Sequence, residues 1–192
     1  MVFSLEKLSI LEVSLLNKKE LRQKFSLIIK QLSKARRKQA SDDACKHLTH
    51  LVNHVTSVAS FAPFGNEIDI WPFNIEMIKQ KKLLLPKVSG KDLNFYKVAD
   101  LSELCPSHWN ILEPSSAKSN LVKTEEIELI IVPGLAYDKQ HQRLGMGKGF
   151  YDRFLSLNNS VKSIGVGFLE QQFTESLPLE PHDQALKNIL LF

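Results

Sequence analysis

Apolar residues recur every three or four positions in residues 18–34. Leu21, Phe25, Ile28 and Leu32 form one stripe at this spacing, which matches the 3.6-residue turn of an α-helix. The polar residues between them occupy the other side. The pattern predicts an amphipathic helix with one buried face.

Two further helices are expected later in the chain. Ser41, followed by Asp42 and Asp43, is typical of an N-cap with an acidic first turn. Another helix is expected to begin near Pro72 and to run to about Gln80.

Short apolar runs, of the kind buried on both faces of a parallel sheet, separate these helices. Three runs stop at a proline: 57–62 before Pro63, 83–85 before Pro86, and 129–132 before Pro133. Further runs lie at 94–98, 163–168 and 189–192. Because strands and helices alternate, we predict an α/β fold with a mostly parallel central sheet and helical crossovers.

Ligands of such sheets bind beyond the carboxyl ends of the strands. Glu67 follows the first strand, Lys87 follows the second, and a polar loop at 134–149 follows the third. We therefore expect these residues to share one rim of the sheet.

The loop ends in Arg143-Leu-Gly145-Met-Gly147-Lys148-Gly149, and Phe150 and Phe154 continue at helical spacing. The expected order is strand, glycine loop, helix. Glycines allow close approach to the backbone amides, and a helix N-terminus attracts anions. An anion-binding loop is favoured, with a purely structural glycine turn as the alternative.

The loop differs from the common phosphate-binding motifs. A Walker A sequence needs Ser or Thr after its lysine, whereas Gly149 follows Lys148.

The sequence leaves the role of two other features open. Trp109 either stacks on a flat ligand or packs as a lid, and Gly165 and Gly167 indicate close packing against a backbone or a ligand.

The chain has 192 residues, a hydrophobic fraction of 43% and a net charge of +4. A chain of this length suits one domain. We expect this domain at 18–192 and an N-terminal extension at 1–17 before it. The charge is compatible with a small anionic ligand or with weak attraction to nucleic acid, and it does not decide between them. We expect a monomer or weak dimer.

The two cysteines form no CxxC pair, and no apolar run approaches the length of a membrane helix. The first residues do not have the pattern of a signal peptide. We expect a cytoplasmic protein with no membrane and no nucleic-acid partner.

The stretch Arg143-Leu-Gly-Met-Gly-Lys-Gly-Phe-Tyr-Asp-Arg153 resembles the signature of the 5-formyltetrahydrofolate cyclo-ligase family, also called methenyltetrahydrofolate synthetases. Lys18-Lys-Glu-Leu-Arg22 resembles the family's N-terminal Lys-x-x-x-Arg. The resemblance implies a three-layer α/β/α sandwich. It also implies Mg²⁺-dependent use of ATP to convert 5-formyltetrahydrofolate to 5,10-methenyltetrahydrofolate, with ADP and phosphate released.

The resemblance also implies a set of site residues. ATP would be held by Lys18, Arg22, Arg143, Leu144, Gly145, Met146, Gly147, Lys148, Gly149, Phe150 and Tyr151. The reduced folate would contact Ala62, Glu67, Trp109, Met146, Gly147, Lys148, Gly149 and Phe150. Lys148 and Arg143 would be catalytic, and Asp152 and Asp183 would bind Mg²⁺.

Two positions depart from the family pattern. Phe150 stands where a tyrosine is common, and Lys187 stands where an acidic residue is usual. The alternative function is a non-catalytic nucleotide- or RNA-binding module that uses the basic loop and the basic run at 35–38.

Overall fold

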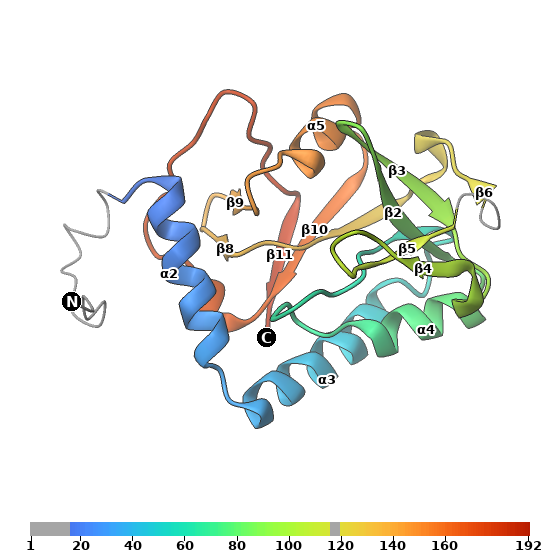
Figure 1. Cartoon of the computed structure of the whole chain (residues 1–192), viewed down its shortest axis with the longest axis horizontal. Helices are drawn as coiled ribbons and strands as arrows, with labels where there is room; N and C mark the ends of the chain where they lie inside the picture. Colours follow the sequence, from blue (N-terminus) through green and yellow to red (C-terminus); the bar gives the residue numbers. More distant parts are fainter. Residues whose placement is uncertain (1–15, 116–119) are drawn as a thin grey trace.

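The structure is a computed structural model that describes residues 16–115 and 120–192. Within these residues the core is one mostly parallel sheet (Figure 1). In spatial order its strands are β11 (Asn188–Leu191), β10 (Lys162–Gly167), β7 (Leu129–Val132), β1 (Val58–Ala59), β2 (Leu83–Ser89), β3 (Asp92–Lys97) and β6 (Asn120–Leu121). The first five strands are parallel to one another. β3 pairs antiparallel with β2, and β6 pairs antiparallel with β3.

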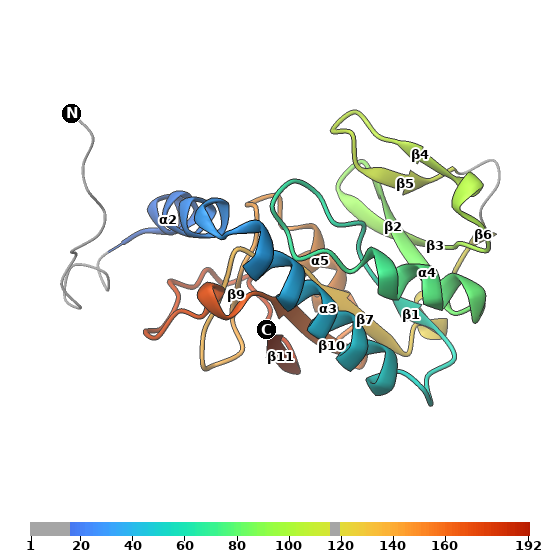
Figure 2. The ribbon, with the colours of Figure 1, turned by 90° about the horizontal axis from the view of Figure 1, so that it is seen from below.

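Helices cover both faces of this sheet. The helices are α2 (Lys18–Gln31), α3 (Lys34–Leu51), α4 (Trp71–Lys79) and α5 (Phe150–Leu157). Figure 1 shows α3 and α4 below the strands and α5 above them, and Figure 2 views the molecule from the side of α3 and α4. The α/β class, the mostly parallel sheet and the three-layer sandwich are therefore confirmed.

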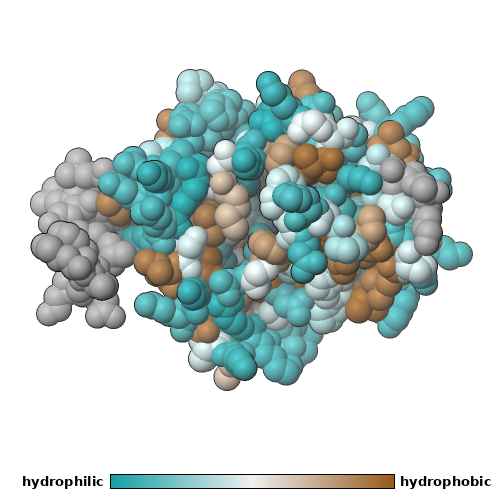
Figure 3. Space-filling view, in the orientation of Figure 1, coloured by the Kyte–Doolittle hydropathy of each residue, from teal (hydrophilic) through white to brown (hydrophobic). Residues whose placement is uncertain are grey.

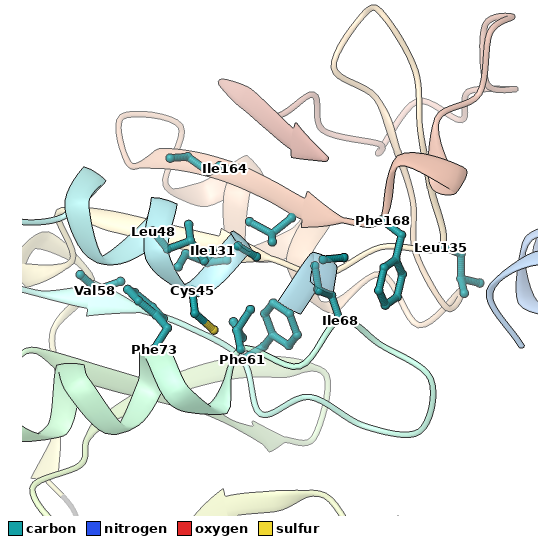
Figure 4. Packing of buried hydrophobic residues seen from close by; sticks show 14 of the residues in the cluster. Cys45, Leu48, Val58, Phe61, Ile68, Phe73, Ile131, Leu135, Ile164 and Phe168 are labelled. Carbon is teal, nitrogen blue, oxygen red and sulfur yellow. The ribbon is translucent and has the colours of Figure 1, made fainter. Parts of the chain in front are cut away.

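The two apolar clusters of the core follow from the alternation of side chains along each strand. Val58 and Ile131 point to the cluster under α3 and α4, where they lie near Leu48 and Phe73 (Figure 4). The other face carries a smaller cluster that includes Phe154 of α5.

The second helix starts earlier than the sequence pattern indicated. Its N-cap is Ser33, whose Oγ accepts a hydrogen bond from the Arg36 amide at 3.1 Å. Ser41 lies inside the helix, so the prediction of a cap there was wrong. The Ser41 Oγ instead accepts a hydrogen bond from the Asp69 amide at 3.0 Å. The serine followed by two acidic residues is a pattern typical of a helix start, but here it lies within the helix.

The strand at 83–85 does not stop at Pro86. It runs on to Ser89 and pairs with β3, with Pro86 opposite Phe95. The neighbouring β1 pairs with this strand only as far as Leu84. Since no ladder on that side needs the missing N–H of Pro86, the proline is tolerated.

Two hairpins were not predicted. One pairs β4 (Leu104–Pro106) with β5 (Leu112–Pro114), and the other pairs β8 (Ala136–Tyr137) with β9 (Arg143–Leu144). The second hairpin lies inside the loop that the sequence indicated as a simple polar connection. It determines how the glycine segment leaves the sheet.

The glycines of β10 make room for a side chain. A Cβ on Gly165 would lie 2.6 Å from Cε1 of Tyr137, and one on Gly167 would lie 3.0 Å from its Cε2. The Tyr137 hydroxyl donates towards the Val166 and Val132 carbonyls, at 3.0 and 3.2 Å. The predicted close packing is present, but its partner is a tyrosine ring of the β8–β9 hairpin.

No helix in the described part of the chain is long and apolar enough to cross a bilayer. On the face that Figure 3 shows, hydrophobic areas are separated by hydrophilic ones.

The expected extension at 1–17 lies almost entirely outside the described residues, and the division at residue 18 stays a prediction.

Candidate active site

A cavity of about 420 Å³ opens beyond the carboxyl ends of the parallel strands. Its lining includes every residue that the sequence analysis assigned to a ligand: Lys18, Arg22, Ala62, Glu67, Trp109, residues 143–152 and Asp183. These residues come from both ends and the middle of the chain. Glu67 and the glycine loop of the expected rim therefore meet at one cavity, whereas Lys87 is not among the residues that line it.

The glycine loop forms one wall of this cavity. Gly147 has φ 91° and Gly149 has φ 63°, conformations that favour glycine. Gly149 is the N-cap of α5 and makes no side-chain cap hydrogen bond. The amides of the first turn of α5 are thus uncapped at the cavity, where an anion can bind.

Arg22 ties helix α2 to this loop. Its Nε donates to the Gly145 carbonyl at 2.9 Å, and its Cζ would lie 3.2 Å from a Cβ on Gly147. A side chain at position 147 would therefore press on the guanidinium. The absence of a Cβ lets a cation and a bare backbone segment share one wall.

Arg143 lies beneath the loop with its side chain only 4% exposed. It donates to the Pro133 carbonyl at 3.2 Å and forms an ion pair with Asp152 at 3.0 Å. Its Nε is buried without a hydrogen-bond partner in the described structure. The guanidinium thus joins the end of β7 to the first turn of α5.

Lys148 differs from these two arginines. It is exposed on the loop and makes no ion pair with any residue of 16–115 or 120–192. Because its ammonium group has no protein partner there, it is available to an anion in the cavity.

Lys18 at the start of α2 binds two acidic groups. Its Nζ lies 2.5 Å from Asp183 Oδ2 and 3.2 Å from Glu180 Oε2. Burial raises the pKa of Asp183, but hydrogen bonds from Lys18 and from the Glu180 amide outweigh it, and the net pKa is lowered. The carboxylate is therefore ionised over the neutral range.

Glu180 and His182 line the same part of the cavity and were missed by the sequence analysis. With Asp183 they bring potential metal-ligand atoms within 4.8 Å of one another, the only such group of three found among the described residues. Only their spacing around Asp183 in Glu180-Pro-His-Asp183 could have indicated them. Asp152 is not a member of this group.

Glu67 lies in the turn after β1. Its Oε2 accepts a hydrogen bond from the Phe64 amide at 2.9 Å. Burial raises the pKa of this carboxyl to about 7, and the Phe64 hydrogen bond lowers it only partly. Burial also raises the pKa of the Tyr151 hydroxyl, and the Glu67 charge adds to this shift. Both residues line the same cavity.

The β4–β5 hairpin closes the cavity opposite the glycine loop. Trp109 is 52% exposed at its tip and lines the cavity, together with Ile111 and Glu113. Burial raises the pKa of Glu113, and the Lys87 charge opposes this shift. Trp109 therefore forms a wall of the cavity, and is not a lid packed on the core.

A second cavity of about 180 Å³ adjoins the first and shares Glu67, Phe61 and Met146 with it. It extends along α2 past Ser26 and Ile29. Glu67 thus lies at the junction of two recesses.

The basic run at 35–38 is largely engaged within the protein. Arg36 forms a two-pronged ion pair with Glu170 at 2.7 and 2.8 Å. Arg37 donates to backbone carbonyls at Leu32, Asn66 and Ile29. These contacts leave little of the run for a polyanion and disfavour the alternative of an RNA-binding module.

Comparison with known proteins places these features in a family. The chain matches the 5-formyltetrahydrofolate cyclo-ligase family over residues 15–191. The 5-formyltetrahydrofolate cyclo-ligase of Escherichia coli strain K12 is 32% identical over 139 residues, which cover 70% of this chain and 76% of that protein. The Haemophilus influenzae protein of the same name is 27% identical over 182 residues, 91% of this chain and 97% of that one.

A solved structure agrees with the sequence matches. The NMR structure of Aquifex aeolicus 5,10-methenyltetrahydrofolate synthetase is similar with a TM-score of 0.79 and 33% sequence identity, covering 90% of this chain and 88% of that one. The fold, the site and these relatives together define an enzyme of the ligase class. The chain belongs to the 5-formyltetrahydrofolate cyclo-ligase family, as the resemblance of its glycine loop predicted.

Proposed function

We propose that this protein catalyses the ATP- and Mg²⁺-dependent cyclisation of 5-formyltetrahydrofolate to 5,10-methenyltetrahydrofolate, with release of ADP and phosphate. The observation that carries the proposal is the meeting of two features in one cavity. A glycine loop with uncapped amides and cations suits a triphosphate, and Glu67 lies opposite in partly apolar surroundings that suit a pterin.

The nucleotide contacts are proposed for Lys18, Arg22 and residues 143–151. Uncapped amides at the start of α5 and the exposed Lys148 support this assignment. Lys18 and Arg22 reach the same cavity from α2. A triphosphate there would accept hydrogen bonds from backbone N–H groups as well as from cations.

The reduced folate is proposed to contact Ala62, Glu67, Trp109 and residues 146–150. Ala62 is buried next to the cavity, and the indole of Trp109 faces it from the hairpin. A flat ring system stacks well on an indole, while a carboxyl group accepts hydrogen bonds from ring N–H groups. Met146 to Phe150 lie between the two ligands in this arrangement.

The acidic residues fit a hydrated Mg²⁺, which prefers one or two carboxylates together with waters and phosphates. Asp152 uses only Oδ1 for Arg143 and the Gln184 amide, and Asp183 uses only Oδ2 for Lys18 and the Glu180 amide. Each keeps one oxygen without a bond to a described residue. Asp152 and Asp183 would hold the ion, which neutralises phosphate charge when bound.

The proposed reaction has two covalent steps. The formyl oxygen attacks the γ-phosphorus of ATP, and the broken P–O bond leaves its electron pair on ADP. The neighbouring amine of the same folate then attacks the formyl carbon and loses its proton, and phosphate leaves with the C–O electron pair. No protein nucleophile is required, so the protein positions the substrates and neutralises charge.

Lys148 is proposed as the catalytic cation that stabilises the moving phosphoryl group, since it has no competing protein partner. Arg143 contributes its positive charge from beneath the loop. Such electrostatic contacts are worth about 3 kcal/mol each in other enzymes.

The test is the appearance of methenyl absorbance when the protein is mixed with 5-formyltetrahydrofolate, Mg²⁺ and ATP. Wild-type protein is expected to give an ATP-dependent signal. Lys148→Ala should cut turnover at least about tenfold because it removes a charge contact in the transition state. Its melting temperature should stay nearly unchanged, since Lys148 is exposed.

Lys139→Ala is the matched control. Lys139 is another exposed lysine of the segment between β7 and α5, but it does not line the cavity. It should keep wild-type turnover. A well-folded wild type without an ATP-dependent signal would contradict the proposed function, and a large melting shift in Lys148→Ala would mean that the loop is structural.

A further inference from the structure

Arg143 is held on several sides by the protein itself. One guanidinium nitrogen donates to the Pro133 carbonyl at the end of β7, and another pairs with Asp152 in the first turn of α5. The side chain is 4% exposed, against 14% for Asp152. The two hydrogen bonds that it makes to described residues are therefore directed at the two ends of the glycine loop.

Two glycines of the loop lie against this side chain. A Cβ on Gly134 would lie 2.8 Å from Arg143 Cγ, and a Cβ on Gly145 would lie 2.8 Å from one of its terminal nitrogens. Neither glycine has a positive φ. The space at Gly145 is thus used by the arginine, and the space at Gly134 is used by the arginine together with the Tyr137 ring.

An aromatic ring completes the enclosure. The Arg143 Cζ lies 5.5 Å from the centre of the Tyr151 ring, within the range of a cation–π contact. The Nε remains buried without a hydrogen-bond partner in the described structure, which costs roughly 1–3 kcal/mol.

From these contacts we infer that Arg143 is a positioning residue: it joins β7 to α5 and so fixes the geometry of the Gly145–Gly149 amides and of Asp152. The guanidinium is suited to this because its rigid planar fork presents separate nitrogens to two partners, whereas a lysine has a single nitrogen that would have to reach both. The kinetic consequence rests on the proposed function, but the effect on the loop does not.

Four variants test the inference. Arg143→Lys keeps the charge and loses the two-way bridge, whereas Arg143→Gln loses both. Asp152→Ala removes the other end of the bridge and serves if the buried arginine cannot be replaced without unfolding. Arg153→Lys is the matched control, because Arg153 is a neighbouring arginine that donates a fork to the Lys91 carbonyl without touching Asp152.

The first measurement is amide hydrogen exchange in the protein without ligands. Exchange at residues 144–152 should become at least about tenfold faster in Arg143→Lys, Arg143→Gln and Asp152→Ala, with the rest of the chain unchanged. Arg153→Lys should stay within about threefold of wild type there. Unchanged exchange in the first three variants, or an equal rise over the whole chain, would overturn the inference.

The second measurement is the steady-state turnover of the cyclisation. Arg143→Lys should lose turnover about as severely as Arg143→Gln. The expected loss is on the order of a hundredfold, since displacing the positioned groups by about 1 Å costs that much. An Arg143→Lys enzyme that keeps at least half of the wild-type turnover would mean that charge alone matters, and the inference would fail. If wild-type protein showed no turnover, the proposed function would fail, while the exchange experiment would still decide the role of Arg143.

Discussion

Glu67 has its carboxyl group at the junction of the two cavities, with one oxygen bound to the Phe64 amide. Burial raises its pKa from 4.5 to about 7 in the folded protein. The folded state therefore binds this proton more tightly than the unfolded chain does. The stability that the proton contributes is present below pH 4.5 and is lost as the pH rises towards 7.

Glu67→Gln should remove this pH dependence, because glutamine keeps an acceptor for the Phe64 amide and has no proton to lose. The melting temperature of Glu67→Gln minus that of wild type should rise between about pH 4.5 and 7 and then stay constant. The full change corresponds to about 3 kcal/mol at most. Melting curves at half-unit steps from pH 4 to 8 measure it.

Glu125→Gln is the control for the loss of one negative charge. Glu125 is exposed in the 3₁₀ turn Thr124–Glu126 and lines neither cavity. Its difference from wild type should not change with pH in this window. A pH-independent difference for Glu67→Gln as well would show that the Glu67 carboxyl is not desolvated.

At the scale of elements, helix α2 is joined to the segment before β11 by the ion pairs of Lys18 with Asp183 and with Glu180. Lys18 and Asp183 have side chains that are 15% and 13% exposed, so removing one partner leaves a nearly buried charge. Lys18→Met and Asp183→Asn should each reduce the free energy of unfolding by about 1–3 kcal/mol at pH 7. The double variant should lose less than the sum, as urea unfolding can measure.

The dependence of stability on pH gives a second test of the Lys18–Asp183 pair. Because the pKa of Asp183 is lowered from 3.8, its contribution is present above that pH and is lost as the pH falls further. Wild type should therefore lose its advantage over Lys18→Met at low pH. Lys38→Met is the control, since the Lys38–Asp42 pair is 75% and 47% exposed and should contribute under about 1 kcal/mol. Strict additivity of the two α2-linked variants would mean that the pair does not hold the elements together.

The elements that the sequence predicted best are those with long periodic patterns. The stripe at Leu21 and Phe25 became the buried face of α2, and the strand–glycine loop–helix order became β7, the loop and α5. The meeting of Glu67 with the glycine loop also followed, because a parallel sheet brings the carboxyl ends of its strands together.

The misplaced boundaries have local physical causes. Ser41 imitated an N-cap because two acidic residues follow it, although the real cap is Ser33. Pro86 can lie within a strand because β1 ends before it, so no residue of β1 is positioned to accept a hydrogen bond from the N–H that proline lacks. Where β2 ends thus depends on the neighbouring strand, about which the local sequence pattern carries no information.

Parts of the site could not be predicted for the same reason. The β8–β9 hairpin has only two residues in each strand, too few for an alternation signal. The enclosure of Arg143 by Pro133, Asp152 and Tyr151 depends on that hairpin. The assignments of individual residues to ATP, folate and Mg²⁺ stay predictions.

At the scale of the whole molecule, the cavity is closed by segments that are distant in the chain. Lys18 belongs to the first described helix, Trp109 to the central hairpin, and Asp183 to the segment before the last strand. A ligand that binds there contacts the folded state only. It should therefore stabilise the whole domain by mass action.

A non-hydrolysable ATP analogue with Mg²⁺, at about a hundred times its dissociation constant, should add about 2.7 kcal/mol. For a chain of this size that is a rise of about 5–10 °C in melting temperature. Gly147→Ala should abolish the rise, because its Cβ would lie 3.2 Å from Arg22 Cζ at a φ of 91° and distort the wall that holds the triphosphate.

Gly90→Ala is the control that separates backbone strain from the loss of nucleotide binding. Gly90 also has a positive φ, 61°, but lies in the turn between β2 and β3 with open space around it. Both variants should melt below wild type without ligand, since alanine is strained in that conformation. Only Gly90→Ala should then regain the full rise with nucleotide. A Gly147→Ala protein that is stabilised as much as wild type would mean that the triphosphate does not bind against the glycine loop.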